Sequence, residues 1–339
     1  MERMNISVDG GALCASNNKQ FGTYHFTKSM IRALAQYDAA NKYEIYTFCS
    51  QPDNCISLNS NVVFKILRPT AGWMNLRVSL QEVAQKKDIF FALNQAIPRF
   101  SRSRIFAWSH GLAYLHKPNL YPDSLSRLMG QLLTLTRRAE RIFVTSLRVK
   151  HDIEQFSNST PIHVVPIGVP YDMPRANQIN RKPFFLFVGM NHPIKNIQFI
   201  IESFNKLSQN KKFAQYRLLL ATDTIVGLQI NNPNVHHVKA SRQELRHLYR
   251  TATALVSASL YESFNMPILE ALSQGCPVVA FESAVIPEFL PYVNVAKTQE
   301  QFIVYLQEAA TESLPLVPTS QIRSQFAWKP IIKTIVSYY

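Results

Sequence analysis

Two glutamates, Glu262 and Glu270, lie eight positions apart in the stretch YESFNMPILEALSQGCPVV, residues 261–279. Pro267 suits a first helical turn and Gly275 suits a helix end, so we expect a helix over about residues 267–274. Glu262 is then expected in the preceding loop and Glu270 in the first turn. Carboxylates bind vicinal hydroxyls, such as those of ribose or a hexose, through both oxygens. The alternative is that Glu270 only complements the helix dipole and Glu262 is solvated.

The start of this helix is also a candidate anion site. Backbone N–H groups at a helix N-terminus point outward with partial positive charge. We expect those of Phe264, Asn265, Met266 and Ile268 to be able to face a phosphate.

A lysine occupies an unfavourable place in FLFVGMNHPIKN, residues 185–196. A buried strand is expected to end at Gly189, and Asn196 is a good N-cap for a helix over about residues 196–208. Lys195 beside that cap costs up to about 1 kcal/mol unless an anion lies between the lysine and the helix end. Lys195 is therefore a candidate phosphate ligand, with a solvated loop lysine as the alternative.

The first half of the chain offers a histidine and several glycines. His110 follows the apolar stretch IFAWS, residues 105–109, and so lies at the carboxyl end of a predicted strand, where such folds contact ligands. A structural histidine is the alternative. Gly10 and Gly11 follow the first strand, and Gly22 precedes the first long helix. Glycines at such places allow close approach of a phosphate or sugar, although loops also use glycine for turns.

Short apolar runs alternate with helical periodicity along the whole chain, which is typical of parallel sheets with crossover helices. We expect strands at residues 4–8, 43–48, 62–66, 89–92, 105–109, 141–145, 162–165, 184–188, 217–221, 235–239, 254–257 and 277–281. Helices are expected at about residues 26–37, 75–87, 123–138, 146–156, 196–208, 242–252, 267–274, 299–311 and 325–337. Ser241 and Glu244 form a predicted capping box for the helix from residue 242.

The pattern predicts two doubly wound domains joined by a linker rich in proline and asparagine. The predicted boundaries are residues 1–170 for the first domain, 171–182 for the linker, 183–324 for the second domain and 325–339 for a last helix. A chain of 339 residues is long enough for two hydrophobic cores.

A formal net charge of +14 suggests an anionic partner. The excess leans to the first half, since residues 1–170 hold 20 of the 36 Lys and Arg but 11 of the 22 Asp and Glu. Basic clusters near residues 99–104 and 137–141, with the amphipathic stretch 75–87, could contact anionic lipid headgroups. No basic stripe is interleaved with aromatic residues, so we do not expect nucleic acid as a partner.

Several absences narrow the chemistry. The chain has no Asp-x-Asp, no Gly-x-Ser-x-Gly and no Walker loop, and its four cysteines lack metal-site spacing. No metal ion or other cofactor is therefore expected. The cysteines are also too few for a disulfide scaffold, and no apolar run reaches the length of a membrane span, which favours a cytoplasmic protein.

The order VGMNHPIKN, then LYRTATALVSASLYESFNMPILEALSQGCPVVAFESAVIPE, resembles the family 4 retaining glycosyltransferases of GT-B fold. SHG near residue 110 and QFAWKPIIKTIVSYY at the end extend the resemblance over the chain. It implies an α/β GT-B fold, in which two Rossmann-like doubly wound domains face each other across a cleft and the C-terminal helix crosses back to the first domain.

The resemblance also implies roles. Glu262 would contact the donor sugar, Glu270 the ribose and Lys195 the diphosphate, beside Gly189 and the backbone of residues 264–266. His110 would lie near the transferred sugar. Gly10, Gly11 and Gly22 would belong to loops beside the donor phosphate and the acceptor.

Three residues depart from the family pattern. Members commonly read Glu-Gly-Phe-Gly where this chain has Glu262-Ser263-Phe264-Asn265, and asparagine replaces a left-handed glycine more readily than serine does. Ile194 stands where a phosphate-binding arginine is usual. Either donor affinity is weaker, another basic residue compensates, or the enzyme is degenerate.

The resemblance implies transfer of a hexose from a nucleoside diphosphate sugar to a hydroxyl of a glycan or lipid-linked acceptor, with retention of configuration. This activity would serve the synthesis of cell-surface polysaccharide or glycolipid. The alternatives are a sugar-nucleotide epimerase of the same fold and a binding subunit without activity. An acceptor at the membrane would favour peripheral attachment to the inner face of the membrane.

Overall fold

The computed structural model describes residues 3–16, 20, 22–50, 59–157, 159–175 and 180–339. The chain divides into two compact units. Unit 1 comprises Met1–Gly168 with Ala327–Tyr339, and unit 2 comprises Val169–Phe326. Residues 176–179 of the predicted linker lie outside the described residues.

Unit 1 contains a sheet of seven strands, all of whose pairings are parallel, in the order β3-β2-β1-β4-β5-β6-β7. The order runs outward in both directions from β1 and β4, which is the arrangement of a doubly wound fold. The strands are β1 (Asn5–Asp9), β2 (Lys42–Thr47), β3 (Val62–Ile66), β4 (Ile89–Ala92), β5 (Arg104–Ser109), β6 (Arg141–Val144) and β7 (Ile162–Val164).

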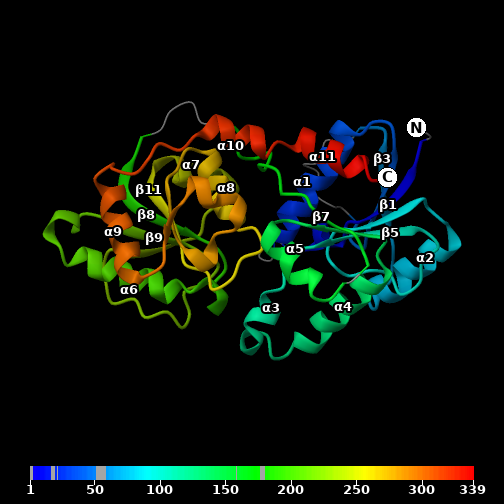
Figure 1. Cartoon of the computed structure of the whole chain (residues 1–339), viewed down its shortest axis with the longest axis horizontal. Coiled ribbons are helices and arrows are strands. Elements are labelled where there is room, and N and C mark those ends of the chain that lie inside the picture. The colour runs from blue at the N-terminus through cyan, green and yellow to red at the C-terminus, as the bar shows by residue number, and fades with distance from the viewer. Residues whose placement is uncertain (1–2, 17–19, 21, 51–58, 158, 176–179) are drawn as a thin grey trace. The chain divides into compact units, whose positions relative to one another are not determined.

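The helices of unit 1 connect these strands (Figure 1). A π-helical turn, Trp73–Val78, leads directly into α2. The α-helices are α1 (Gly22–Tyr37), α2 (Ser79–Ala84), α3 (Ala113–His116), α4 (Leu125–Arg138), α5 (Leu147–Glu154) and α11 (Trp328–Val336).

The C-terminal segment packs on unit 1, where α11 contacts α1 (Figure 1). A Cβ atom on Gly168 would lie 2.5 Å from the Trp328 indole, so glycine is needed for this packing. The last residue is held by the Tyr339 hydroxyl, 3.2 Å from the hydroxyl of Tyr43. The predicted return of the last helix to the first domain is therefore confirmed.

Unit 2 contains a sheet of six strands, again paired in parallel, in the order β10-β9-β8-β11-β12-β13. Its strands are β8 (Lys182–Val188), β9 (Arg217–Ala221), β10 (Val235–Val238), β11 (Ala252–Ser257), β12 (Val278–Phe281) and β13 (Asn294–Ala296). Its helices are α6 (Ile197–Ser208), α7 (Arg242–Thr251), α8 (Met266–Ser273), α9 (Gln299–Ala310) and α10 (Thr319–Gln325).

Buried aromatic and aliphatic side chains on one face of the unit 2 sheet pack against α6 and α9 to form a core, for example Phe185 on β8 and Phe204 on α6. The apolar side chains of α6 are buried in this core: Ile197, Ile200, Ile201, Phe204 and Leu207. A separate cluster including Phe90 and Leu135 forms part of the core of unit 1.

The structure adds elements that the sequence pattern did not predict. The strand β13 has three residues, and α10 buries a single apolar side chain, Ile322, so neither has a readable period. The helix predicted over residues 75–87 begins as a π turn at Trp73 and ends at Ala84, because the backbone at Gln85 is no longer helical. Among the described residues, no helix is long and apolar enough to cross a bilayer.

Cys14 and Cys49 form a disulfide with Cα atoms 5.4 Å apart, while Cys276 is buried and free. The sequence did not predict this pair, since two cysteines 35 residues apart carry no spacing signal. The pairing removes the cysteine-based argument for a reducing compartment. Cys55 lies outside the described residues.

Candidate active site

The candidate residues of unit 2 lie at the carboxyl ends of β8 and β11, which are neighbours in the sheet. These are the two central strands from which the order runs outward. Gly189 and Lys195 follow β8, and Glu262 follows β11. Ligands of doubly wound sheets bind at this point because the loops from two adjacent strands diverge there.

Lys195 and Glu262 form an ion pair, with Nζ 2.5 Å from Oε1. Their side chains are only 19% and 11% exposed. A backbone hydrogen bond from Leu260 to the carbonyl of Ile194 (2.8 Å) ties the two loops together. The lysine is therefore neither solvated nor alone, and its charge is held beside a carboxylate.

Lys195 ends a short 3-10 turn, Pro193–Lys195, in which the His192 side chain accepts a hydrogen bond from the Ile194 N–H. Burial, and then the charge of Lys195, lower the pKa of His192. Asn196 is the N-cap residue of α6, as predicted, but its side chain makes no cap hydrogen bond. Its φ of 51° instead turns the chain sharply into α6.

The N-terminus of α8 has a special backbone. Asn265 has φ 63°, as expected for asparagine replacing a left-handed glycine. Its side-chain amide donates to the Ser257 hydroxyl and to the carbonyl of Ala284, both at 3.0 Å, which fixes the turn. The Phe264 ring is buried against Phe289.

Backbone donors are available at this end. Among the described residues, the N–H groups of Phe264, Asn265 and Met266 donate to no protein acceptor. Ile268 is different, because its N–H donates to the carbonyl of Asn265 (3.0 Å). The expectation that Ile268 also faces an anion is therefore wrong.

Glu270 is the fifth residue of α8 and only 3% exposed. The expectation that it lies in the first turn is wrong, because the helix begins one residue earlier than predicted. The alternative that Glu270 only complements the helix dipole also fails, because two protein side chains bind its carboxylate. Arg242 Nη2 lies 2.8 Å from Oε1, and the Tyr249 hydroxyl donates to Oε2 at 2.9 Å.

Arg242 bridges two carboxylates. Its Nε and Nη2 both donate to Asp172 at 2.9 Å, in addition to the contact with Glu270. Burial lowers the pKa of Arg242, but the two carboxylates outweigh it and raise the pKa above its ordinary value. Burial and then Glu270 raise the pKa of Tyr249, so this phenol stays protonated as a donor.

The sequence analysis missed Arg242, Tyr249 and Asp172. One signal was present for Arg242. It is the first residue of a helix whose capping box, Ser241 with Glu244, was predicted and is formed. A cation there is disfavoured for the same reason as Lys195, which indicates a nearby anion.

In unit 1, packing explains two of the candidate glycines. A Cβ on Gly10 would lie 2.8 Å from the carbonyl oxygen of Tyr46, and one on Gly11 would lie 2.8 Å from the Trp73 ring. The close approach is therefore to other parts of the protein. Contact of these glycines with a ligand stays a prediction, as it does for Gly22, which begins α1.

His110 follows β5, and its Nε2 lies 2.6 Å from the carbonyl oxygen of Leu93. Because a carbonyl only accepts, Nε2 carries the hydrogen. Burial lowers the pKa of His110 to about 4, against the opposing effect of this hydrogen bond. The neutral ring therefore presents Nδ1 as an acceptor.

The loop after β1 lies close to the loop after β4. Asp9 is buried, and accepts from the Gly11 N–H (2.9 Å) and the Asn94 amide (3.0 Å). Burial raises the pKa of Asp9 despite these bonds. Within the described residues, no three His, Cys, Asp or Glu side chains are grouped to hold a metal ion.

Residues 182–312 match the family described as "Glycosyl transferases group 1". The O-antigen chain mannosyltransferase RfbU of Salmonella typhimurium is 27% identical over 243 residues, which cover 66% of this chain and 64% of that relative. This chain thus matches less than two thirds of the relative's length.

Two solved structures share the fold over nearly the whole chain. Sucrose-phosphate synthase from Thermosynechococcus elongatus has a TM-score of 0.74 at 14% identity, covering 99% of this chain and 98% of its own. The Anabaena protein HepE, in complex with UDP-glucose, has a TM-score of 0.70 at 14% identity, covering 99% of both chains. These likenesses confirm the predicted GT-B fold class, and residues 182–312 of this chain are similar to the glycosyl transferases group 1 family.

Proposed function

We propose that this protein is a retaining hexosyltransferase that moves a hexose from a nucleoside diphosphate sugar to a hydroxyl of a glycan or lipid-linked acceptor. The observation that carries the proposal is the Lys195–Glu262 pair beside the open N–H groups of α8. One carboxylate, one cation and one helix N-terminus lie together in unit 2, and the carboxylate would bind the sugar. The family match and the related O-antigen mannosyltransferase support it and make mannose the first sugar to test.

The chemistry follows from charge. As the bond between the sugar C1 and the phosphate oxygen breaks, negative charge develops on the departing diphosphate. Lys195 and the N–H groups of Phe264, Asn265 and Met266 would stabilise that charge without a resident metal ion. Glu262 would accept hydrogen bonds from the sugar, and Glu270 from the ribose.

We propose front-face attack for the transfer itself. The acceptor oxygen forms the new bond to C1, and its proton passes to the departing phosphate oxygen. Configuration is retained because attack and departure occur on the same face. His110 would accept a hydrogen bond from the transferred sugar through Nδ1. The loops that contain Gly10, Gly11 and Gly22 would lie beside the donor phosphate and the acceptor.

The decisive experiment is a panel of nucleoside diphosphate hexoses, read by thermal shift and by release of the nucleoside diphosphate. One donor should raise Tm, and Glu262→Gln and Lys195→Gln should lower kcat by about 10²–10³. Glu202→Gln, on the exposed face of α6, is the matched control. Conversion of the donor alone to a new sugar nucleotide would identify an epimerase, and no shift with any donor would indicate a subunit without activity.

A further inference from the structure

The helix Trp73–Ala84, formed by the π turn and α2, buries several polar side chains beside the apolar Val78 and exposes a row of aliphatic ones. Ser79, Gln81 and Glu82 are buried, with Glu82 fully inaccessible. Leu76, Leu80 and Val83 are spaced by four and three positions, so they form one stripe. This stripe is between 43% and 56% exposed.

The exposed aliphatic side of this helix opposes folding in water, and its buried carboxylate is tolerated only because it is hydrogen-bonded. Burying a carboxylate costs free energy unless it is fully hydrogen-bonded, and exposing three large aliphatic side chains forgoes their burial. Local conflicts of this kind are expected at functional surfaces. The helix is therefore built to present its aliphatic stripe to something outside the chain.

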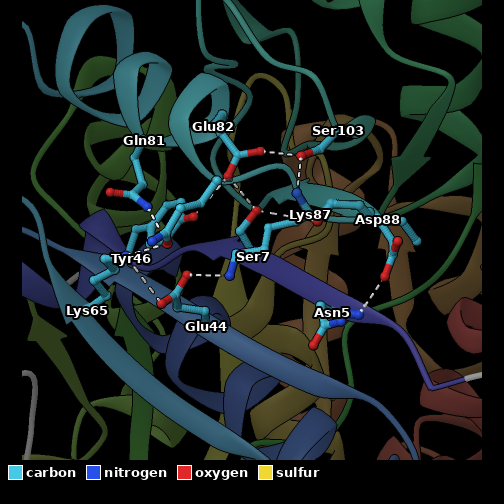
Figure 2. Close-up of polar contacts among 12 residues, drawn as sticks. Asn5, Ser7, Glu44, Tyr46, Lys65, Gln81, Glu82, Lys87, Asp88 and Ser103 are labelled. Carbon is cyan, nitrogen blue, oxygen red and sulfur yellow. Dashed lines mark hydrogen bonds and ion pairs between the residues drawn. The ribbon is translucent and has the colours of Figure 1, made fainter.

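Glu82 fixes the helix in this orientation (Figure 2). Its Oε1 accepts from the hydroxyls of Ser7 (2.7 Å) and Tyr46 (3.0 Å), which belong to β1 and β2. Its Oε2 accepts from Ser103 (2.6 Å) and Ser101 (3.3 Å), in the segment before β5. One carboxylate thus joins the helix, the sheet and the loop 97–103.

That loop adds an aromatic ring to the stripe. The N–H of Phe100 donates to the Ser79 hydroxyl (3.2 Å), which brings the loop against the helix, and the ring is 59% exposed. The Arg99 guanidinium lies 5.6 Å from the centre of this ring. We define the stripe with Phe100 as the apolar surface patch of unit 1.

Four cations accompany the patch on the same segments: Arg77, Lys86, Arg99 and Arg102. None of them forms an ion pair with a residue in the described ranges. The acids of residues 73–104 are Glu82, which is buried, and Asp88, which accepts from the Asn5 N–H (2.7 Å). The surroundings of the patch are therefore positively charged.

We propose that this patch docks the protein on an anionic lipid bilayer, with Leu76, Leu80, Val83 and Phe100 inserted at the interface and the four cations on the headgroups. An aliphatic and aromatic face rimmed by Arg and Lys is the pattern of interfacial helices. A second copy of this chain fits less well, because a two-fold contact would bring the same cations together.

The test is flotation of the full chain with vesicles of phosphatidylcholine, with and without about 30% phosphatidylglycerol, a content chosen to give an anionic surface. Leu76→Gln/Leu80→Gln should lower vesicle partitioning roughly tenfold or more. Arg99→Gln/Arg102→Gln should lower it roughly fivefold per residue, on anionic vesicles at low salt only. The matched control is Leu147→Gln/Leu316→Gln, which changes two exposed leucines elsewhere.

The proposal is overturned if the wild-type chain does not float, or if the patch variants float like the control. Self-association that the patch variants abolish, without vesicle binding, would assign the patch to a second copy. Flotation uses neither donor nor acceptor, so its failure leaves the proposed transfer untouched. Transfer to a water-soluble acceptor should be unchanged in Leu76→Gln/Leu80→Gln.

Discussion

Two buried glutamates, one in each unit, have similar surroundings and different partners. Glu82 in unit 1 and Glu270 in unit 2 are both almost inaccessible, and each accepts from a tyrosine hydroxyl, Tyr46 or Tyr249. Glu82 takes its remaining hydrogen bonds from serine hydroxyls. Glu270 takes its other one from Arg242, which also holds Asp172.

The difference separates a structural carboxylate from a candidate ligand. Four hydroxyl donors fill both oxygens of Glu82, which leaves little capacity for a further partner. Glu270 has one protein donor on each oxygen, so each oxygen can accept another hydrogen bond. A buried acid is therefore not a functional signal by itself, whereas a buried acid with spare acceptor capacity beside a ligand site is one.

The largest expected effect comes from removing Glu82. Glu82→Ala should lower the free energy of unfolding by about 3–5 kcal/mol, because the hydroxyls of Tyr46 and Ser103 lose their acceptor and a cavity opens. The hydroxyls of Ser7 and Ser101 keep only backbone carbonyls as acceptors. Urea denaturation measures it. Glu140→Ala, which removes an exposed ion pair with Arg104, should cost less than about 1 kcal/mol and is the control. Equal losses for both variants would contradict the structural role of Glu82.

The second prediction concerns His110, at the carboxyl edge of the unit 1 sheet, and the effect of its lowered pKa on stability. Its pKa in the folded chain is about 4, below the ordinary value of 6.5. The unfolded chain therefore takes up the proton first as the pH falls. The contribution of the neutral His110 ring to the free energy of unfolding is complete above pH 6.5. It is lost between pH 6.5 and 4, by up to about 3 kcal/mol. His110→Gln should flatten this part of the pH–stability curve, and an unchanged curve would contradict a partly buried neutral ring.

Glu270→Gln should affect donor binding more than stability. We expect the KM for the nucleotide sugar to rise about tenfold or more, with kcat changed less, because the interaction is made in both the ground state and the transition state. Arg242 keeps Asp172, so the loss of stability should stay near 1 kcal/mol. Donor-dependence kinetics measure the KM. If Glu82→Gln raised the KM as much, the distinction between the two glutamates would fail.

Much of the fold was predictable from local pattern. The strands β3, β4 and β9 have the predicted bounds, because short apolar runs between polar turns identify the strands of a parallel sheet. Glu262 and Lys195 were placed in loops because proline, glycine and asparagine mark where elements end. Their contact with each other was not predictable, since it depends on β8 and β11 being neighbours in the sheet.

The rest required tertiary structure. Sequence periodicity predicted a helix near residue 80 but not which face is buried, because Glu82 faces inward only when distant hydroxyls, such as Ser7 and Tyr46, converge on it. Asp172 and Tyr249 likewise contact Arg242 and Glu270 only because the fold brings separate segments of the chain together. Sequence periodicity indicates the secondary structure that a segment prefers. It does not indicate which distant side chains decide the face that the segment buries.

The smallest and sharpest comparison removes one tyrosine hydroxyl from each glutamate. Tyr46→Phe and Tyr249→Phe each delete a buried donor without changing the ring, so each should lower the free energy of unfolding by about 1 kcal/mol. The two variants should differ in kinetics. Tyr249→Phe would free one oxygen of Glu270 to turn away from the ribose that we propose it binds, so the donor KM should rise severalfold. Tyr46→Phe should leave the KM unchanged, because Glu82 keeps three other donors and lies outside the proposed site. Equal KM values in the two variants would show that Tyr249 supports the fold alone, and the hydroxyl would then have no part in positioning Glu270.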